Sequence, residues 1–205
     1  MLKQTFINLV SEYTDSQYVI NDLWFDIEKR YSSRKRHYHT LAHLENVLLE
    51  LLPLRSQIEN WNVLLFSLYY HDIIYSSLKA NNEFKSAEHA ENQLSQLSIS
   101  KSEIELCKQH ILATKLHEFS DHNDTNYFTD ADLSILGKNW NSYRLFFLNV
   151  RKEYAFFPTY LYNKGRRKAL NHFLEMEQIY KTDFFYKKYE IQAKENLQKE
   201  INLLS

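Results

Sequence analysis

The amino-acid sequence predicts an all-α fold, and three observations support that prediction. The chain contains only 2 glycines and 2 prolines in 205 residues, whereas a β-protein of this size needs many glycines in its turns. Apolar residues recur at steps of three or four along most of the chain, which is the period of an amphipathic helix. Neither an internal repeat nor a low-complexity linker divides the chain. We therefore expect one all-α domain over residues 1–205.

The first helices are predicted by stripes of apolar residues. One stripe comprises Ile20, Leu23, Trp24, Ile27 and Tyr31. A second comprises Leu41, Leu44, Val47, Leu48 and Leu51, and Pro53 ends it because proline cannot continue a helix. The segment from Trp61 to Tyr75 is apolar on nearly every side, so a buried helix is expected there.

The remaining helices are predicted from the same period. They cover approximately residues 83–97, 102–116, 140–154, 159–180 and 183–203. Ser102, with Glu105 three residues later, has the pattern of a capping box at a helix start. The polar stretch over residues 117–130 is the longest predicted loop.

Composition and charge limit the classes of partner. The net charge is −1, so no basic field favours a nucleic acid polymer or an acidic membrane. The N-terminus lacks the pattern of a signal peptide, and the most apolar run, residues 63–70, is too short to span a bilayer. The single cysteine, Cys107, permits no internal disulfide. We expect a cytoplasmic protein with no membrane partner.

The stretch "RHYHTLAHLENVLLELL" (36–52) places His37, His39 and His43 within seven residues. Imidazole is the commonest metal ligand and a proton carrier near neutral pH. If the helix has begun by His39, then His39 and His43, four residues apart, face the same way. The alternative is a pair of surface histidines at a helix start, and His37 lies off that face.

The segment "YYHDIIY" (69–75) ends an apolar helix with His71 and Asp72. Burying an ionised aspartate is costly unless it is paired or bound to a cation. The pair is therefore either a hydrogen bond between helices, a metal site or a catalytic pair.

Acidic residues occur at two further places. In "FTDADLSIL" (128–136), capping accounts for one of Asp130 and Asp132, but a second carboxylate exceeds what capping needs. Glu83 suits the first turn of a helix, where the helix dipole favours an acid, and equally suits a proton acceptor or a group beside the site. His110, Thr114 and His117 share one helix face, which alone is more typical of a polar surface.

Taken in order, these residues resemble the HD-domain superfamily of metal-dependent phosphohydrolases. The order is H-x₃-H, then HD, then Asp132 sixty positions after Asp72. "YHTLAHL" is similar to the Y-H-N-x-x-H-A signature of the cyclic nucleotide phosphodiesterases, and "ILATKLH" and "DADLSIL" resemble further segments of those enzymes. Thr40 replaces the usual asparagine, and the downstream histidines that help hold a second metal there have no clear counterpart after Asp72.

The whole chain is most similar to a smaller bacterial group of metal-dependent HD phosphohydrolases, itself inferred from sequences. Seven segments follow the order of that group: "RHYHTLAH", "HDIIY", "NNEFKSA", "ATKLH", "DADLSILG", "RKEY" and "GRR". The two letters HD alone are weak, whereas seven ordered motifs are specific. The fold that this resemblance implies is an HD-domain helical bundle.

The resemblance also implies roles for individual residues. The ligands of one divalent metal would be His43, His71, Asp72 and Asp132. His39 would be the general acid, and Asp130 would lie outside the metal's ligands as a cap or an orienting group. Glu83 and His117 would line the cavity, where they would hold a second ion through water or contact substrate, Glu83 as a proton acceptor. On charge alone, the residues expected to contact phosphate are Arg36, Lys115 and Arg151.

The expected cofactor is one or two divalent ions of Mn, Fe, Zn, Ni, Co or Mg, and mixed histidine and carboxylate ligands favour the first four. The expected function is hydrolysis of a small phosphorylated molecule, with a nucleotide favoured, by a metal-activated hydroxide. Two alternatives stay open: a di-iron HD oxygenase, and an HD domain that binds a nucleotide or a partner without chemistry. The aromatic segments after Tyr154 are compatible with a homodimer.

Overall fold

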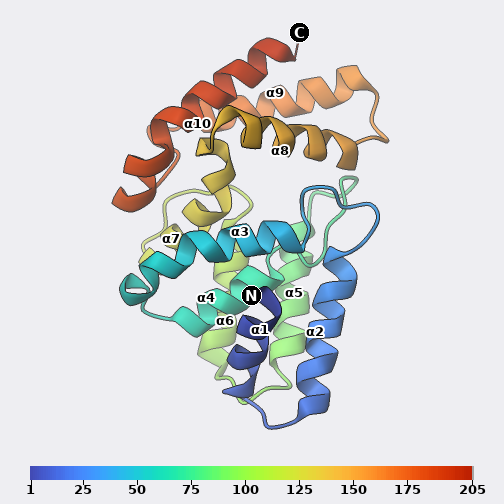
Figure 1. Cartoon of the computed structure of the whole chain (residues 1–205), viewed down its shortest axis with the longest axis vertical. Coiled ribbons are helices and arrows are strands. Elements are labelled where there is room, and N and C mark those ends of the chain that lie inside the picture. The colour runs from blue at the N-terminus through green and yellow to red at the C-terminus, as the bar shows by residue number, and fades with distance from the viewer. Residues whose placement is uncertain (205) are drawn as a thin grey trace. The chain divides into compact units, whose positions relative to one another are not determined.

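The structure is a computed structural model that describes residues 1–204, and within that range it contains helices and no strand (Figure 1). The predicted all-α class is confirmed. Internal contacts divide the chain into two compact units, one of residues 1–129 and one from Asp130 onward. The single domain and the HD-type bundle stay predictions. No helix in the described range is long and apolar enough to cross a membrane.

The first unit is built from the helices up to α7 (Figure 1). They are α1 (Leu2–Ser11), α2 (Gln17–Tyr31), α3 (Leu41–Leu51), the 3₁₀ turn η1 (Leu52–Gln57), α4 (Trp61–Tyr70), α5 (Asn82–Leu94), α6 (Lys101–Ala113) and α7 (Asn123–Asp132). The unit boundary falls within α7. The second unit continues with the 3₁₀ turn η2 (Leu133–Gly137), α8 (Trp140–Glu153), α9 (Thr159–Glu175) and α10 (Asp183–Leu203).

Helix α4 forms the centre of the first unit. Every residue from Val63 to Tyr70 is buried, and the helix packs against α6, α5, α3 and α1. It ends at Tyr70 rather than at the predicted Tyr75, because the backbone amides that follow bond to side chains. The Asp72 amide donates to the hydroxyl of Tyr31, and the Ile74 amide donates to that of Ser86. The sharp end of α4 leaves His71 and Asp72 at its C-terminal tip.

The predicted loop over residues 117–130 is partly wrong, because α7 begins at Asn123. Its polar side chains are buried and form tertiary hydrogen bonds, so they hide the apolar period of a helix. The carboxylate of Asp124 accepts from the amides of Glu59 and Asn60 at the start of α4. The amide side chain of Asn126 bonds to the backbone N–H and C=O of Ser120.

Other helix boundaries also differ from prediction. The capping box of α6 uses Ser100 and Glu103, not Ser102 and Glu105. Helix α9 ends at Glu175, since Met176 has an extended backbone. Helix α1 was not predicted, although its buried residues Leu2, Phe6, Leu9 and Val10 recur at helical spacing.

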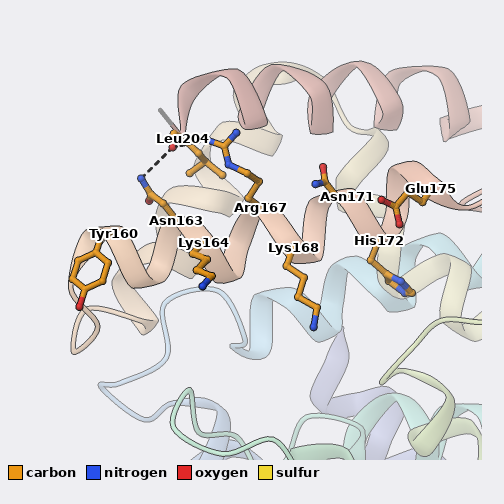
Figure 2. A pocket seen from close by; sticks show the side chains of 9 residues that line it. All are labelled: Tyr160, Asn163, Lys164, Arg167, Lys168, Asn171, His172, Glu175 and Leu204. Atoms are coloured by element: carbon orange, nitrogen blue, oxygen red, sulfur yellow. Dashed lines mark hydrogen bonds between the residues drawn. The ribbon is translucent and has the colours of Figure 1, made fainter.

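In the second unit, α10 packs against η2 and α9, and α8 packs against η2. Gly137 permits the approach of η2 to α10: a Cβ at this position would meet the side chain of Tyr189 and lie 2.7 Å from its backbone oxygen. The C-terminal end of α10 is held by α9, since Asn163 and Arg167 both donate to the carbonyl of Leu204 (Figure 2).

Candidate metal centre

The loop before α3 is fastened to the end of α4 by Arg36, which is buried. Its guanidinium donates to the carbonyl of His39 at 3.1 Å, to that of Asp72 at 2.8 Å and to that of Ile73 at 2.9 Å. It also lies over the ring of Tyr31, 4.6 Å from the centroid. Arg36 therefore brings the first histidine segment beside the HD segment, and these contacts indicate a positioning role. Its predicted contact with phosphate stays a prediction.

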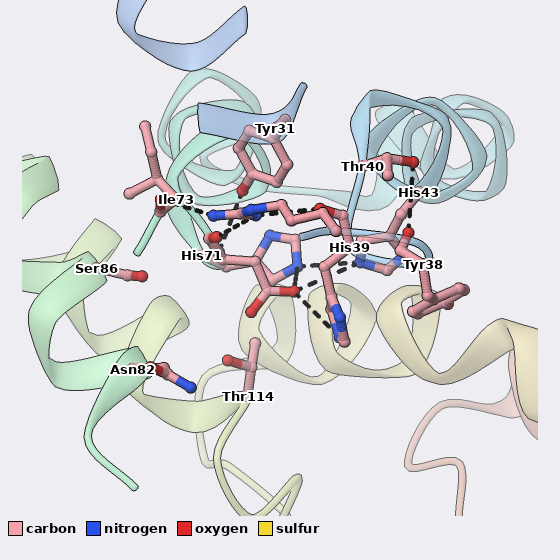
Figure 3. Close-up of polar contacts among 12 residues, drawn as sticks. Tyr31, Tyr38, His39, Thr40, His43, His71, Ile73, Asn82, Ser86 and Thr114 are labelled. Carbon is pink, nitrogen blue, oxygen red and sulfur yellow. Dashed lines mark hydrogen bonds and ion pairs between the residues drawn. The ribbon is translucent and has the colours of Figure 1, made fainter. Parts of the chain in front are cut away.

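Three side chains converge where these two segments meet (Figure 3). The Nε2 atoms of His43 and His71 are 3.2 Å apart. The Oδ2 atom of Asp72 lies 3.2 Å from Nε2 of His71 and 3.9 Å from Nε2 of His43. Two ligands that each lie ~2.1 Å from one ion are ~3.0 Å apart at a right angle and ~4.2 Å apart on opposite sides. The three separations fall within that range, so these atoms fit a shared ion.

The tautomer of His71 is set by a backbone hydrogen bond. Its Nδ1 lies 2.9 Å from the carbonyl oxygen of Leu68, and a carbonyl can only accept, so Nδ1 carries the proton. In the neutral ring, Nε2 then presents a lone pair toward His43 and Asp72. Histidines that bind metals usually donate their other ring N–H in this way. The donor set thus has the chemistry that a divalent metal requires.

Asp132 is the last residue of α7. Among the described residues, His43, His71 and Asp132 form one group that could hold a metal ion, since each offers a ligand atom and these atoms lie within 4.8 Å of one another. His43 and His71 are buried, and Asp132 is half-buried. Metal binding by this group stays a prediction.

His39 does not lie in a helix, contrary to the expectation that α3 has begun there. Helix α3 begins at Leu41, with Thr40 as its N-cap. The ring of His39 nevertheless lies 5.9 Å from that of His43 and stacks on Tyr75 at 4.2 Å. Its Nε2 is 3.8 Å from Oδ2 of Asp72, and its side chain is 19% exposed against 3% for His43. The loop thus places His39 beside the cluster in a position that solvent reaches.

Helix α5 contributes two positioning residues that the sequence reasoning missed, although "NNEFKSA" contains both (Figure 3). Ser86 accepts from the amide of Ile74 and donates to its carbonyl. Asn82 bonds to both backbone groups of Ser76. Their spacing of four residues puts both on one face of α5. That spacing, opposite a loop that needs backbone partners, is the signal that could have identified them.

The other four predicted site residues differ in burial and in their contacts. Glu83 is half-buried in the first turn of α5, and no hydrogen bond or ion pair within the described range ties it to the cluster. Lys115 is exposed beyond the end of α6. His117 is buried and has a φ of 54°, a left-handed conformation that is uncommon for residues other than glycine. Arg151, in α8, donates to the carbonyls of Tyr154 and Phe157. The roles predicted for these four residues stay predictions.

Asp130 differs from Asp132 in its contacts. It is fully buried, and it accepts from the amides of Lys181 and Thr182 and from the hydroxyl of Thr182 just before α10. The ammonium of Lys181 lies 3.0 Å from it. Both carboxylate oxygens are therefore engaged in anchoring the segment before α10. Asp130 lies inside α7 and does not cap the apolar run that follows it.

His110 is buried, not on a polar surface. Its Nδ1 lies 3.1 Å from the hydroxyl of Ser67. Burial and, secondarily, the neighbouring His122 lower the pKa of His110 to about 3, so the ring is neutral at physiological pH. His110 thus belongs to the core of the first unit.

Comparison with known proteins finds no family model that matches the chain, and no curated protein or solved structure that is significantly similar to it. The resemblance to HD phosphohydrolases therefore rests on the ordered motifs alone.

Proposed function

We propose that the chain is a metal-dependent phosphohydrolase that acts on a small phosphorylated molecule, with nucleotides as the first class to test. The observation that carries this proposal is the convergence of Nε2 of His43, Nε2 of His71 and Oδ2 of Asp72 within 3.2–3.9 Å. Such mixed nitrogen and oxygen donors suit Mn²⁺, Fe²⁺, Ni²⁺ or Zn²⁺.

In this proposal, His43, His71 and Asp72 hold one divalent ion together with Asp132. When bound, such an ion makes a water molecule more acidic and neutralises charge on a phosphoryl group. In the neutral ring of His71, the hydrogen bond from Nδ1 to Leu68 leaves Nε2 as the nitrogen with the lone pair. Arg36 holds the two ligand segments in register through the carbonyls of His39 and Asp72.

His39 is the proposed proton donor to the leaving oxygen, through Nε2. It is the most exposed of the three clustered imidazoles, so it can regain its proton from solvent after each turnover. Stacking on Tyr75 fixes the plane of its ring. A positioned general acid is worth typically 10²–10⁴-fold in rate.

The test is a phosphatase screen of the purified chain over nucleoside mono-, di- and triphosphates and cyclic nucleotides, with added Mn²⁺, Ni²⁺, Co²⁺ or Mg²⁺. We expect metal-dependent phosphate release or ring opening that Asp72→Asn abolishes. The matched control is His37→Ala, since His37 is exposed in the same histidine segment and should retain full activity.

Three results would contradict the proposal. An oxygen-dependent product formed only with iron would assign the site to a di-iron oxygenase. Nucleotide binding without turnover under every metal would leave a binding domain. Activity that survives Asp72→Asn would place the chemistry outside this cluster.

A further inference from the structure

The second unit contains a cavity where the end of α8 meets α9. Its volume is about 340 Å³, at the lower end of the ~300–1,000 Å³ typical of small-molecule sites. The apolar part of its wall is formed by Val150, Tyr154, Phe157, Leu161 and Ala169. None of the lining residues belongs to the proposed metal centre. The wall instead includes Tyr154 of "RKEY" and Gly165 and Arg166 of "GRR", three residues to which the proposed hydrolysis gives no role.

Gly165 keeps this cavity open. It lies in the interior of α9, where glycine costs up to ~1 kcal/mol relative to alanine. A Cβ built at Gly165 would meet nothing within 4 Å, whereas one at Gly137 would collide with Tyr189. No close neighbour therefore requires a glycine at 165. A larger side chain at this position would extend into the cavity that the residue lines.

Tyr162 supplies a polar group without a partner in the wall. It is 8% exposed, and its buried hydroxyl forms no hydrogen bond with any described residue. Burial raises its pKa, so the phenol stays protonated and can donate. Buried polar groups are nearly always satisfied by protein, water or ligand, so this hydroxyl calls for an acceptor.

The charges around Tyr162 favour an anion. Arg166 is the charged residue among those that line the cavity, and the guanidinium of Arg151 lies over the Tyr162 ring at 4.7 Å. The acid whose charge acts on Tyr162, Glu200, accepts two bonds from Arg166, at 2.8 and 2.9 Å, and a third from Tyr143. Because Glu200 is engaged on both oxygens, it offers little to a cationic ligand.

We propose that this cavity binds a small, mainly apolar molecule that ends in a carboxylate, with the carboxylate accepting from the hydroxyl of Tyr162 beside Arg166. The volume corresponds to about ten water molecules in the liquid, so an alkyl chain of moderate length fits. The other face of α9 differs, because three cations, Lys164, Arg167 and Lys168, line a more open groove there (Figure 2).

The test titrates octanoate into the full chain by isothermal calorimetry, with octylammonium as the probe of opposite charge. From typical ligand efficiencies for about ten non-hydrogen atoms, octanoate should bind with a Kd on the order of 1 mM or tighter. Gly165→Leu should abolish binding by filling the cavity. Gly165→Ala is the matched control, and it should keep the affinity within about threefold because one methyl removes little of the volume. Tyr162→Phe should weaken binding about tenfold through the lost hydrogen bond.

Circular dichroism of each variant shows whether it is folded. Loss of binding in Gly165→Leu counts as support only if the variant keeps the helical spectrum of the unchanged chain. If that variant fails to fold, Tyr162→Phe carries the test. Three results would each overturn the proposal: no octanoate binding at about tenfold the expected Kd, octylammonium binding as tightly as octanoate, or unchanged affinity in folded Gly165→Leu or in Tyr162→Phe.

Discussion

Replacement of Arg36 by alanine tests whether this side chain holds the two histidine segments together or binds phosphate. Its guanidinium satisfies three carbonyls, those of His39, Asp72 and Ile73. The Ile73 residue is 1% exposed, so an orphaned carbonyl there costs about 1–3 kcal/mol. Water can partly replace the bonds to His39 and Asp72, which costs under ~1 kcal/mol each. Loss of the cation–π contact with Tyr31 adds about 1 kcal/mol.

The sum predicts that Arg36→Ala lowers the free energy of unfolding by about 3–5 kcal/mol, a large fraction of the 5–15 kcal/mol typical of a domain. Urea unfolding measures this value. Arg34→Ala is the matched control, because Arg34 is exposed two residues earlier and should change stability by less than about 0.5 kcal/mol. Arg36→Lys should fall between the two, since an ammonium cannot span three carbonyls. A loss below about 1 kcal/mol together with a raised KM would refute the positioning role and favour phosphate binding.

Three further predictions concern the glycines and two histidines. Gly137→Ala should destabilise the chain by about 1–3 kcal/mol because its Cβ meets Tyr189, whereas Gly165→Ala should stabilise it by about 0.5–1 kcal/mol, and urea unfolding gives both signs. The pKa of His110 is about 3 in the folded chain against 6.5 when unfolded, so the unfolded chain binds the extra proton as the pH falls below 6.5. Stability should therefore drop by up to about 1.4 kcal/mol per pH unit, and His110→Gln should flatten that slope; an unchanged slope would contradict burial as its cause. His39→Ala should retain metal and lose about 10²–10⁴-fold in turnover, with a smaller loss on a nitrophenyl ester, whose leaving group needs no proton; full activity on both esters, or loss of metal, would remove His39 as the acid.

The helical class was predictable because breakers are scarce and the apolar period is long, and α4 was predictable because it is apolar all round. Helix α7 was not predictable, because the side chains of Asp124 and Asn126 are buried and accept hydrogen bonds from backbone amides outside the helix. A sequence does not reveal whether a polar side chain faces water or a buried amide. For the same reason, the sequence predicted Asp130 only as a cap or an orienting group, and its hydrogen bonds to the segment before α10 were not predictable.

The candidate site was predictable to the level of residue type and order. The spacing argument for His39 and His43 assumed that the helix has begun by His39, whereas α3 begins at Leu41. The loop before α3, not a shared helix face, brings the two rings together. The partners that fix this loop, Arg36 and Ser86, act through carbonyls and amides. Backbone groups are the same at every position, so the sequence carries no direct signal of which ones a side chain will bind.

The central claim is that His43, His71, Asp72 and Asp132 hold a divalent ion, and metal content per chain tests it most directly. The chain and its variants would be loaded with Mn²⁺, Fe²⁺, Ni²⁺ or Zn²⁺, dialysed and measured by inductively coupled plasma mass spectrometry. The account predicts one or two ions per chain, lost or sharply reduced in His43→Ala, His71→Ala and Asp132→Asn and retained in His37→Ala and Asp130→Asn. A folded chain that binds none of these metals, or one in which Asp130→Asn strips the ion while Asp132→Asn does not, would contradict it.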